Sequence, residues 1–336
     1  MQNNYSADRR GKRMEPLVSV IMAAYNSEKF VGAAIESILA QTYNNFELLI
    51  IEDASTDRTD SVIKSYRDIR IRVLSNEHNS GTLYCMQRGV EEAKGKYVAV
   101  LDSDDIAEPE RIRMQVKVLE KKPEVLLCAT KVKNLVDDRL ERNEYLPIKN
   151  ARQLRFLLLF ENVIAHSSIM FRKKELQIRN IQYETYSYCH DYNLIMNVGQ
   201  ISPIYVINRE LGQYRIHRKQ KTNILSKKKI ALEVNSVKER FVQQINELDR
   251  DEKDILCKAV WGKLRNFGEY YKLRKVLFHY ASLCHLNQKE DKKLILYGFY
   301  KMFYIQPHSY RWYVYYMVGI YLRNASGRID EWAKMK

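Results

Sequence analysis

The sequence predicts an α/β fold, with a mostly parallel sheet flanked by helices and a helical C-terminal region after it. Apolar, β-branched runs alternate with amphipathic runs from residue 17 to residue 122, as strands joined by crossover helices do. Polar residues follow three of the apolar runs directly. Beyond Thr222 the strand pattern stops, and long runs with helical spacing carry interleaved aromatic and basic residues.

Each element of the first part has a local reason. The β-branched, apolar runs predict strands at residues 17–24, 46–53, 71–76 and 97–102. Helical spacing of apolar residues predicts helices at residues 27–41, 56–67, 82–94 and 109–122. Ser27 is expected to cap the first helix. Pro109 is expected in the first turn of the last one, where its missing N–H costs nothing.

The composition describes a basic, globular chain. It has 336 residues, 46% of them hydrophobic, a formal net charge of +15 and a pI near 9.4. Such a charge favours an anionic partner: nucleic acid, an anionic membrane face or a phosphorylated substrate. The 5 cysteines form no C-x-x-C pair, so neither a zinc site nor a disulfide framework is expected, and a reducing cytoplasm fits.

Neither a signal peptide nor a membrane span is expected. The N-terminal residues are polar and basic, without an apolar core. The longest apolar run, at residues 312–322, has 11 residues, well short of the ~20 that cross a bilayer. We therefore expect a cytoplasmic protein.

Polar side chains follow the first, second and fourth predicted strands. In a parallel sheet the carboxyl ends of the strands form the ligand-binding edge, so we expect these clusters to meet at one site. The alternative is that each cluster is a solvated turn or helix cap. The clusters are Tyr25-Asn26, Glu52-Asp53 and Asp102-Ser103-Asp104-Asp105.

The acidic cluster predicts a divalent cation. Neither a G-x-G-x-x-G after the first strand nor a G-x-x-x-x-G-K-[ST] occurs, so the two common phosphate-binding loops are absent. Carboxylates packed together repel one another unless a cation lies among them. Hard oxygen ligands suit Mg²⁺ or Mn²⁺, which also bind diphosphates.

These motifs resemble those of a known family. The run "VSVIMAAYNSEKFVGAAIESILAQTYNNFELLIIEDASTD", followed by "NSGT" and "RGVEEAKGKYVAVLDSDD", closely resembles the N-terminal domain of family 2 glycosyltransferases. Those enzymes are inverting, use nucleotide sugars and have the Rossmann-like GT-A fold. The resemblance is strong over residues 16–130 and weaker over residues 160–222.

The resemblance implies roles for the residues at the predicted edge. Asp53 matches the acid that hydrogen-bonds the base, usually uracil. Asp104, with Asp102, matches the D-x-D motif that holds Mn²⁺ or Mg²⁺ on the diphosphate, Asp102 lying near the ribose. The positions matched to nucleotide-sugar binding are Ala24, Tyr25, Asn26, Asp53, Asp102, Ser103 and Asp105.

Two departures from the family pattern occur. The family often has two Asp-like acids where this chain reads Glu52-Asp53. It also often carries an Arg where this chain has Met86 in "CMQRG". The diphosphate contact that this Arg would make is therefore in question: either Arg88 substitutes for it, or no residue does.

Asp191 is the candidate catalytic base. An inverting transfer needs one carboxylate to take the acceptor's proton, and "CHDYNLIM" resembles the family's E-D-x-x-L signature, with His190 in place of Glu. The competing interpretation makes Asp191 a helix N-cap. His166, Arg215 and His217 match positions on the acceptor and diphosphate side; His166 as a structural histidine and the other two as part of a basic surface strand are the alternatives.

Three parts of the chain are expected: a basic tail at 1–15, a GT-A domain at 16–222 and a helical region at 223–336. Within the domain, residues 16–130 would bind the donor and residues 131–222 the acceptor. Aromatic and basic residues in the helical region suggest peripheral contact with an anionic inner membrane face. The alternative is that the region is an ordinary helical bundle.

The predicted function is transfer of a hexose or N-acetylhexosamine from a nucleotide sugar, expected to be UDP-linked, to a lipid-linked saccharide acceptor. The reaction would belong to bacterial surface polysaccharide synthesis. A nucleic-acid-binding protein is disfavoured because no such motif occurs and the acids would repel phosphates. A sugar nucleotidyltransferase usually has a Gly-rich loop where this chain reads "AAYNSEK". An inactive scaffold would not need Asp104 and Asp191.

Overall fold

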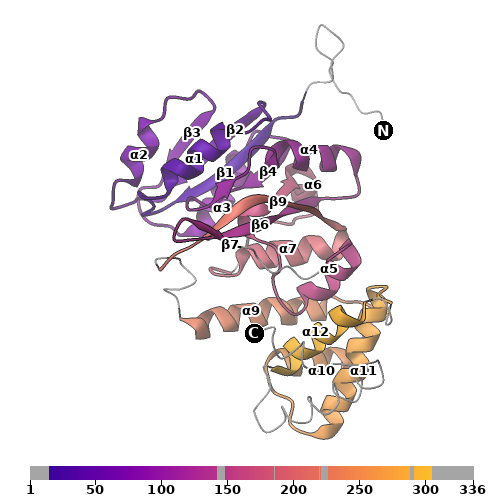
Figure 1. The fold of residues 1–336 in the computed structure, drawn as a ribbon. Helices are drawn as coiled ribbons and strands as arrows, with labels where there is room; N and C mark the ends of the chain where they lie inside the picture. Colours follow the sequence, from indigo (N-terminus) through magenta and orange to yellow (C-terminus); the bar gives the residue numbers. More distant parts are fainter. Residues whose placement is uncertain are drawn as a thin grey trace. The chain divides into compact units, whose positions relative to one another are not determined.

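The computed structural model describes residues 15–141, 148–184, 186–218, 220, 226–287 and 291–304 (Figure 1). Contacts divide the chain into two compact units, residues 1–145 with 164–230, and residues 146–163 with 231–336. The predicted tail lies outside the described residues except for Glu15, and the apolar run at 312–322 lies outside them altogether.

The first unit contains the predicted parallel strands. Neighbouring strands follow the order β3-β2-β1-β4, and the three pairings between them are all parallel. Each strand lies within one or two residues of its predicted bounds: β1 Val18–Ala24, β2 Phe46–Glu52, β3 Ile71–Ser75 and β4 Tyr97–Val100.

The other side of the sheet is mixed, which the expectation of a mostly parallel sheet did not include. Beyond β4 the order continues β8-β6-β9-β5, with β7 paired to β6. Among the described residues on this side, only the β6–β9 pairing is parallel. The strands are β5 Ile106–Ala107, β6 Leu127–Val136, β7 Arg139–Glu141, β8 Met170–Arg172 and β9 Ile204–Ile216.

Helices cover both faces of the parallel strands. Buried side chains of α1 (Val31–Leu39), α2 (Thr59–Ser65) and α4 (Arg111–Lys121) share a core with Val18, Val20 and Met22 of β1. The opposite face contacts α3 (Thr82–Glu92), where a Cβ at Gly89 would lie 2.6 Å from Cγ2 of Ile21. Because both faces are covered, β1 reads as a continuous apolar run.

The predicted cap of the first helix is wrong. Phe30 occupies the cap position of α1, and residues 27–30 form a turn in which the Ser27 carbonyl accepts from the N–H groups of Phe30 and Val31. Ser27 is buried and its own N–H donates to Oγ1 of Thr59 at 2.7 Å. Ser27 thus precedes the helix by a full turn and contacts the start of α2 through its backbone.

The rest of the first unit supplies short helices next to the mixed strands. These are η1 (His166–Ser168), α6 (Lys173–Ile178) and α7 (His190–Ile201). Helix α7 starts at His190, with Cys189 in the cap position. Asp191 thus lies in the first turn of the helix and is not its N-cap.

The second unit is helical among its described residues (Figure 1). Residues 261–266 separate two helices within the region predicted to be helical, and Asn266 caps the second of them through the N–H of Glu269. The helices are α5 Ala151–Leu158, α9 Lys227–Gln243, α10 Arg250–Val260, α11 Phe267–Leu283 and α12 Lys292–Tyr304.

Two further observations concern the environment of the chain. In the part of the chain that the structure describes, no helix combines the length and the apolar character required to cross a bilayer. All five cysteines are buried and unpaired with one another. Burial raises the pKa of the Cys128 thiol to about 12.

Gly95 offers a test of the packing at the amino ends of β1 and β4. A Cβ there would lie 2.5 Å from the Ser19 nitrogen and 2.7 Å from the Tyr97 carbonyl oxygen. Both are backbone atoms, so the two strands would have to separate. Gly95→Ala should lower the free energy of unfolding by about 1–3 kcal/mol, measured by thermal unfolding.

Gly32→Ala is the matched control for Gly95→Ala. A Cβ at Gly32, in helix α1, would meet only side-chain atoms, the nearest 3.3 Å away. Ala is favoured over Gly inside a helix by roughly 0.5–1 kcal/mol. Equal melting temperatures for the two variants would contradict the packing described here.

Candidate active site

The carboxyl ends of β1, β2 and β4 lie at one edge of the sheet. Ala24 pairs with Glu52 across β1 and β2, and Ile21 pairs with Val100 across β1 and β4. The three polar clusters predicted to meet therefore follow neighbouring strands at the same edge. That expected convergence is confirmed.

The loops after β1 and β2 each contain one residue with a left-handed backbone conformation, and hydrogen bonds join the two loops. Asn26 has φ 47° and Ala54 has φ 55°, a conformation that L residues adopt only when their surroundings hold them there. The side-chain Oδ1 of Asn26 accepts from the N–H of Thr56 at 2.8 Å, and its own N–H donates to Oγ of Ser55 at 3.1 Å. Next to them, Tyr25 is 45% exposed and Ala24 is fully buried.

Asp53 organises the loop that precedes α3. Its Oδ1 accepts from Nδ2 of Asn76 at 2.6 Å and from the N–H of Ser80 at 2.9 Å, and its Oδ2 accepts from the N–H of Gly81 at 2.9 Å. Gly81 has φ 86°, a conformation that favours glycine. The predicted base-binding acid is thus buried and held in place, and its contact with a base stays a prediction.

The two residues named for the family's missing Arg lie on α3. Met86 is fully buried and belongs to the core. Arg88 donates from Nη1 to the carbonyl of Ser75 at 3.0 Å and to Oδ1 of Asn76. Arg88 therefore lies at the carboxyl end of β3, beside the asparagine that contacts Asp53.

Three acids crowd the end of β4. Burial and the charge of Asp102 raise the pKa of Asp104 against an opposing hydrogen bond from His217, and burial and the charges of Asp104 and Asp102 raise that of Asp105. Asp105 is 1% exposed, and its Oδ1 accepts from the backbone N–H of Arg215 at 2.8 Å. Ser103 is half-buried in the turn between Asp102 and Asp104.

The end of β9 supplies cationic partners to this cluster. Nε of Arg215 donates to the Asp104 carbonyl at 2.9 Å, and Nη1 pairs with Asp138 at 2.6 Å. Nε2 of His217 lies 3.0 Å from Oδ2 of Asp104. The ring of Phe30, which precedes α1, packs against both: it lies 4.7 Å from the His217 ring and 4.9 Å from the Arg215 guanidinium.

A buried arginine lies behind the acids. Arg111, in the first turn of α4, is 1% exposed and donates to the carbonyls of Val100 at 2.6 Å and Ile169 at 3.3 Å. Gln115, one turn later, donates to the Ser168 carbonyl at 2.8 Å. These bonds fasten α4 to the end of β4 and to η1. Burial lowers the pKa of Arg111 to about 10, and the charges of Asp105 and Asp102 act against that change.

His166 connects the acids to α7, the helix of Asp191. Its Nδ1 lies 3.3 Å from Oδ1 of Asp102, and its Nε2 lies 2.9 Å from the hydroxyl of Tyr183. Burial opposes the charged imidazolium, but the charge and hydrogen bond of Asp102 and the charge of Asp191 outweigh it, so the pKa of His166 is raised. Burial also opposes ionisation of Asp102, whose pKa is nevertheless lowered, chiefly by His166.

Known proteins are similar to this chain in sequence. The model of "Glycosyl transferase family 2" matches residues 19–178. An uncharacterized glycosyltransferase of Methanocaldococcus jannaschii is 33% identical over 197 residues, covering 54% of this chain and 68% of the relative. The chain belongs to glycosyltransferase family 2.

A second relative carries a more specific name. WfgD of Escherichia coli, a UDP-Glc:alpha-D-GlcNAc-diphosphoundecaprenol beta-1,3-glucosyltransferase, is 40% identical over 105 residues. The match covers 31% of this chain and 42% of WfgD, less than half of either protein.

Solved structures of glycosyltransferases share the fold. TarS of S. aureus in complex with UDP-GlcNAc has a TM-score of 0.59 at 18% identity, over 85% of this chain and 88% of that one. A mannosyltransferase from Pyrobaculum calidifontis with GDP-Man and Mn2+ has a TM-score of 0.55 at 16% identity, over 80% and 76%. The predicted GT-A fold with a helical C-terminal region is thereby confirmed.

The residues of this family 2 site suit a divalent cation. Among the described residues, no group of three or more His, Cys, Asp and Glu side chains forms a complete metal site. Mg²⁺ in substrate complexes is usually held by one or two carboxylates while phosphates and water complete its shell. Asp104 and Asp102 fit that arrangement, because they are two carboxylates close together in the chain and in space. Burial and the charge of Asp102 raise the pKa of Asp104, and a cation would offset that negative charge.

The sequence pattern missed several residues of the site. Tyr183 and Phe30 contact the predicted site residues His166 and His217. Arg111 and Gln115 bond the carbonyls of Val100 and Ser168, which lie next to the site in the chain. Arg111 and Gln115 did carry a signal, since "PERIRMQ" places an arginine and a glutamine four residues apart on one helix face, here the buried one. Tyr183 lies in irregular structure, where no periodicity marks it.

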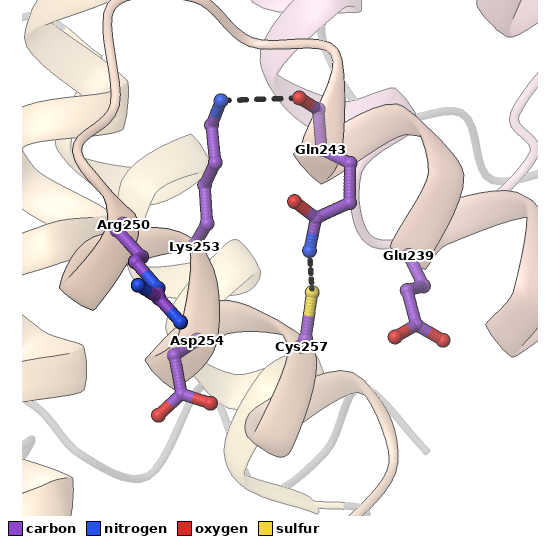
Figure 2. Close-up of a pocket in the computed structure, with 6 residues that line it drawn as sticks. All are labelled: Glu239, Gln243, Arg250, Lys253, Asp254 and Cys257. Atoms are coloured by element: carbon purple, nitrogen blue, oxygen red, sulfur yellow. Dashed lines mark hydrogen bonds between the residues drawn. The ribbon is translucent and has the colours of Figure 1, made fainter.

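A pocket in the second unit contains none of the predicted site residues. It has a volume of about 480 Å³ and lies between α9 and α10 (Figure 2). Its charged groups are already engaged in part, since Nζ of Lys253 donates to the Gln243 carbonyl at 3.0 Å. The lining residues are Glu239, Gln243, Arg250, Lys253, Asp254 and Cys257.

Arg111 generates a prediction about how the acidic edge is supported. Arg111→Met removes both carbonyl contacts. The Ile169 carbonyl keeps the N–H of Val100, so the main loss is the bond to the buried Val100 carbonyl, about 1–3 kcal/mol. The urea midpoint of unfolding should fall accordingly. Lys117→Met, an exposed position on the same helix, should change stability by no more than ~0.5 kcal/mol. Similar midpoints for the two variants would show that Arg111 does not support the site.

Proposed function

We propose that this chain is a metal-dependent, inverting glycosyltransferase. It would move a hexose or N-acetylhexosamine from a UDP-linked donor to a lipid-linked saccharide in the synthesis of a cell-surface polysaccharide. The observation that carries the proposal is the pair of contacts at the carboxyl edge of the sheet, His166 with Asp102 and His217 with Asp104. The charge of Asp191 acts on His166 as well.

The donor half of the proposal rests on Asp53 and the D-x-D acids. Tyr25, Asn26 and Asp53 would hold the nucleoside, with Ala24 forming the buried floor beside them. Asp104, with Asp102, would hold Mn²⁺ or Mg²⁺, which when bound stabilises the negative charge of the leaving diphosphate. The Mn2+ in the Pyrobaculum enzyme and the UDP-Glc in the name of WfgD support this assignment.

In the reaction proposed, Asp191 accepts the proton of the acceptor hydroxyl. The hydroxyl oxygen forms a bond to the anomeric carbon while the bond from that carbon to the UDP oxygen breaks on the opposite face. UDP leaves with the bonding electron pair, and the configuration at the anomeric carbon is inverted. Arg215 and His217 lie on the acids from β9 and would meet the diphosphate oxygens, for which Arg has suitable geometry.

The acceptor proposal draws on chemistry and on one relative. A lipid-linked saccharide would place the enzyme at the inner face of the cell membrane, as a peripheral protein. The name of WfgD specifies a GlcNAc-diphosphoundecaprenol acceptor. In this proposal residues 16–130 bind the donor, residues 131–222 bind the acceptor and residues 223–336 face the membrane.

Two substitutions separate donor binding from chemistry. Asp104→Ala should weaken Mn²⁺-dependent binding of UDP about tenfold or more, that is by at least ~1.4 kcal/mol. Asp191→Asn should leave that binding unchanged and lower kcat roughly 10²- to 10⁴-fold, since general-base assistance is lost. Calorimetric titration with UDP, GDP and dTDP, with and without Mn²⁺, and turnover of UDP-glucose measure the two effects.

The control for both variants is Asp60→Asn, an acid of α2 that pairs with Lys64. Near-normal turnover by Asp191→Asn would make the base assignment wrong. Failure of the wild type to bind any of the nucleotides would favour an inactive scaffold. Formation of a UDP-sugar from UTP and a sugar 1-phosphate would favour a nucleotidyltransferase.

A face of α11 supports the membrane part of the proposal. Residues 270–287 contain no acidic residue. Tyr271 is 49% exposed, and Nζ of Lys275 lies 4.8 Å from the centre of its ring. The guanidinium of Arg274 lies 5.8 Å from the ring of Phe278. Aromatic and basic side chains together favour the interface of an anionic bilayer.

Charge reversal tests this face. Each Lys near anionic lipid contributes about 1 kcal/mol, so Lys272→Glu with Lys275→Glu should weaken binding to phosphatidylserine-containing vesicles at least tenfold at low salt. The matched control reverses two exposed lysines of α4, Lys117 and Lys121. Equal vesicle binding by both double variants would contradict a role for α11.

A further inference from the structure

Three buried rings pack against one another between η1 and the start of α7. His166 and Tyr183 have ring centres 5.7 Å apart, His166 and His190 5.5 Å, and Tyr183 and His190 5.8 Å. The nearly equal distances describe a triangular cluster, which we call the three-ring cluster. Phe171 of β8 meets its outer side, 6.5 Å from the Tyr183 ring.

The three-ring cluster lies between the donor acids and Asp191. His166 approaches Oδ1 of Asp102 through Nδ1 and the Tyr183 hydroxyl through Nε2, so one imidazole contacts both an acid of the D-x-D motif and the phenol. His190 is the first residue of α7, and Asp191 is the next. The charge of Asp191 acts on both His166 and Tyr183.

Tyr183 is also tied to the donor side through its backbone. Its carbonyl accepts from Nε2 of Gln87 on α3 at 2.8 Å. The side chain is 2% exposed, so its hydroxyl has little access to water that might replace the bond to His166. A buried hydroxyl with a single defined partner has a directional effect, because loss of that bond leaves a polar group unsatisfied.

We propose that Tyr183 is a positioning residue that sets the place of Asp191 relative to Asp102. It acts through its hydroxyl on His166 and through its ring on His190. This inference rests on the proposed function, since it assigns the two acids to opposite faces of the transferred sugar. The hydroxyl carries no proton in the reaction and does not need to contact substrate.

The three-ring cluster also accounts for the histidine that stands where the family pattern has Glu. His190 is 6% exposed, and its neighbours in the cluster are two other rings. A carboxylate at that position would be buried beside Asp191 and near Asp102, adding negative charge where three acids already lie close together. An imidazole fills the same place by ring packing.

Tyr183→Phe is the decisive variant because it keeps the ring and removes one oxygen. Tyr205→Phe is the control: that side chain is 39% exposed at the beginning of β9. Three quantities are compared in the full-length protein: hydrogen exchange of the amides at residues 190–195, Mn²⁺-dependent UDP affinity by calorimetry, and kcat and KM for UDP-glucose turnover per UDP-binding site.

The expected result is faster exchange at residues 190–195, unchanged UDP affinity and KM, and a kcat lower by roughly 10- to 100-fold, as for a slightly misplaced reacting group. Unchanged exchange would overturn the inference whatever the activity. Faster exchange with a normal kcat, or a parallel loss of UDP affinity, would make Tyr183 a structural residue only. If the wild type turned over no donor, the proposed function would fail, and the positioning role that rests on it would be withdrawn with it.

Discussion

Mutual repulsion among Asp102, Asp104 and Asp105 is the constraint on which the site depends. Burial and their own charges raise the pKa of Asp104 and Asp105, so the folded chain must bring positive or hydrogen-bonding groups to them. The nearest partners come from far along the chain: His166 for Asp102, His217 for Asp104 and the Arg215 backbone for Asp105. These partners come from η1 and from the end of β9, which belong to the mixed side of the sheet or lie next to it.

That arrangement explains why the parallel and mixed sides of the sheet depend on each other. The parallel strands provide an edge where the acids and the nucleoside-binding loops meet, as in other α/β sheets. Strand β9 ends at Ile216, directly before His217, and η1 contains His166. Arg111 and Gln115 connect α4 to β4 and to η1 through the backbone carbonyls of Val100 and Ser168. The partners of the three acids therefore stabilise both the local fold and the negative charge of the acids.

Much of this could be predicted from the sequence, and the reasons for the remainder are physical. Periodicity located the parallel strands, and the rule on strand ends brought Asn26, Asp53 and Asp102 together. Ser27 was assigned wrongly because a turn at residues 27–30 delays the start of the helix to Val31, which its local cap signal does not reveal. Tyr183 was missed because its contacts arise only when distant segments meet. Short strands such as β5 and β8 carry too few residues for periodicity to reveal them.

The buried thiols have a practical consequence for work on this protein. Burial raises the pKa of Cys85 and Cys128 to about 12 and that of Cys284 to about 11, and the reactive species of cysteine is the thiolate. Alkylating dyes should therefore leave the native chain almost unmodified. Cysteines introduced at two exposed positions of the first unit would then carry a donor and an acceptor fluorophore, and the distance between them could be followed by energy transfer without removing any natural cysteine.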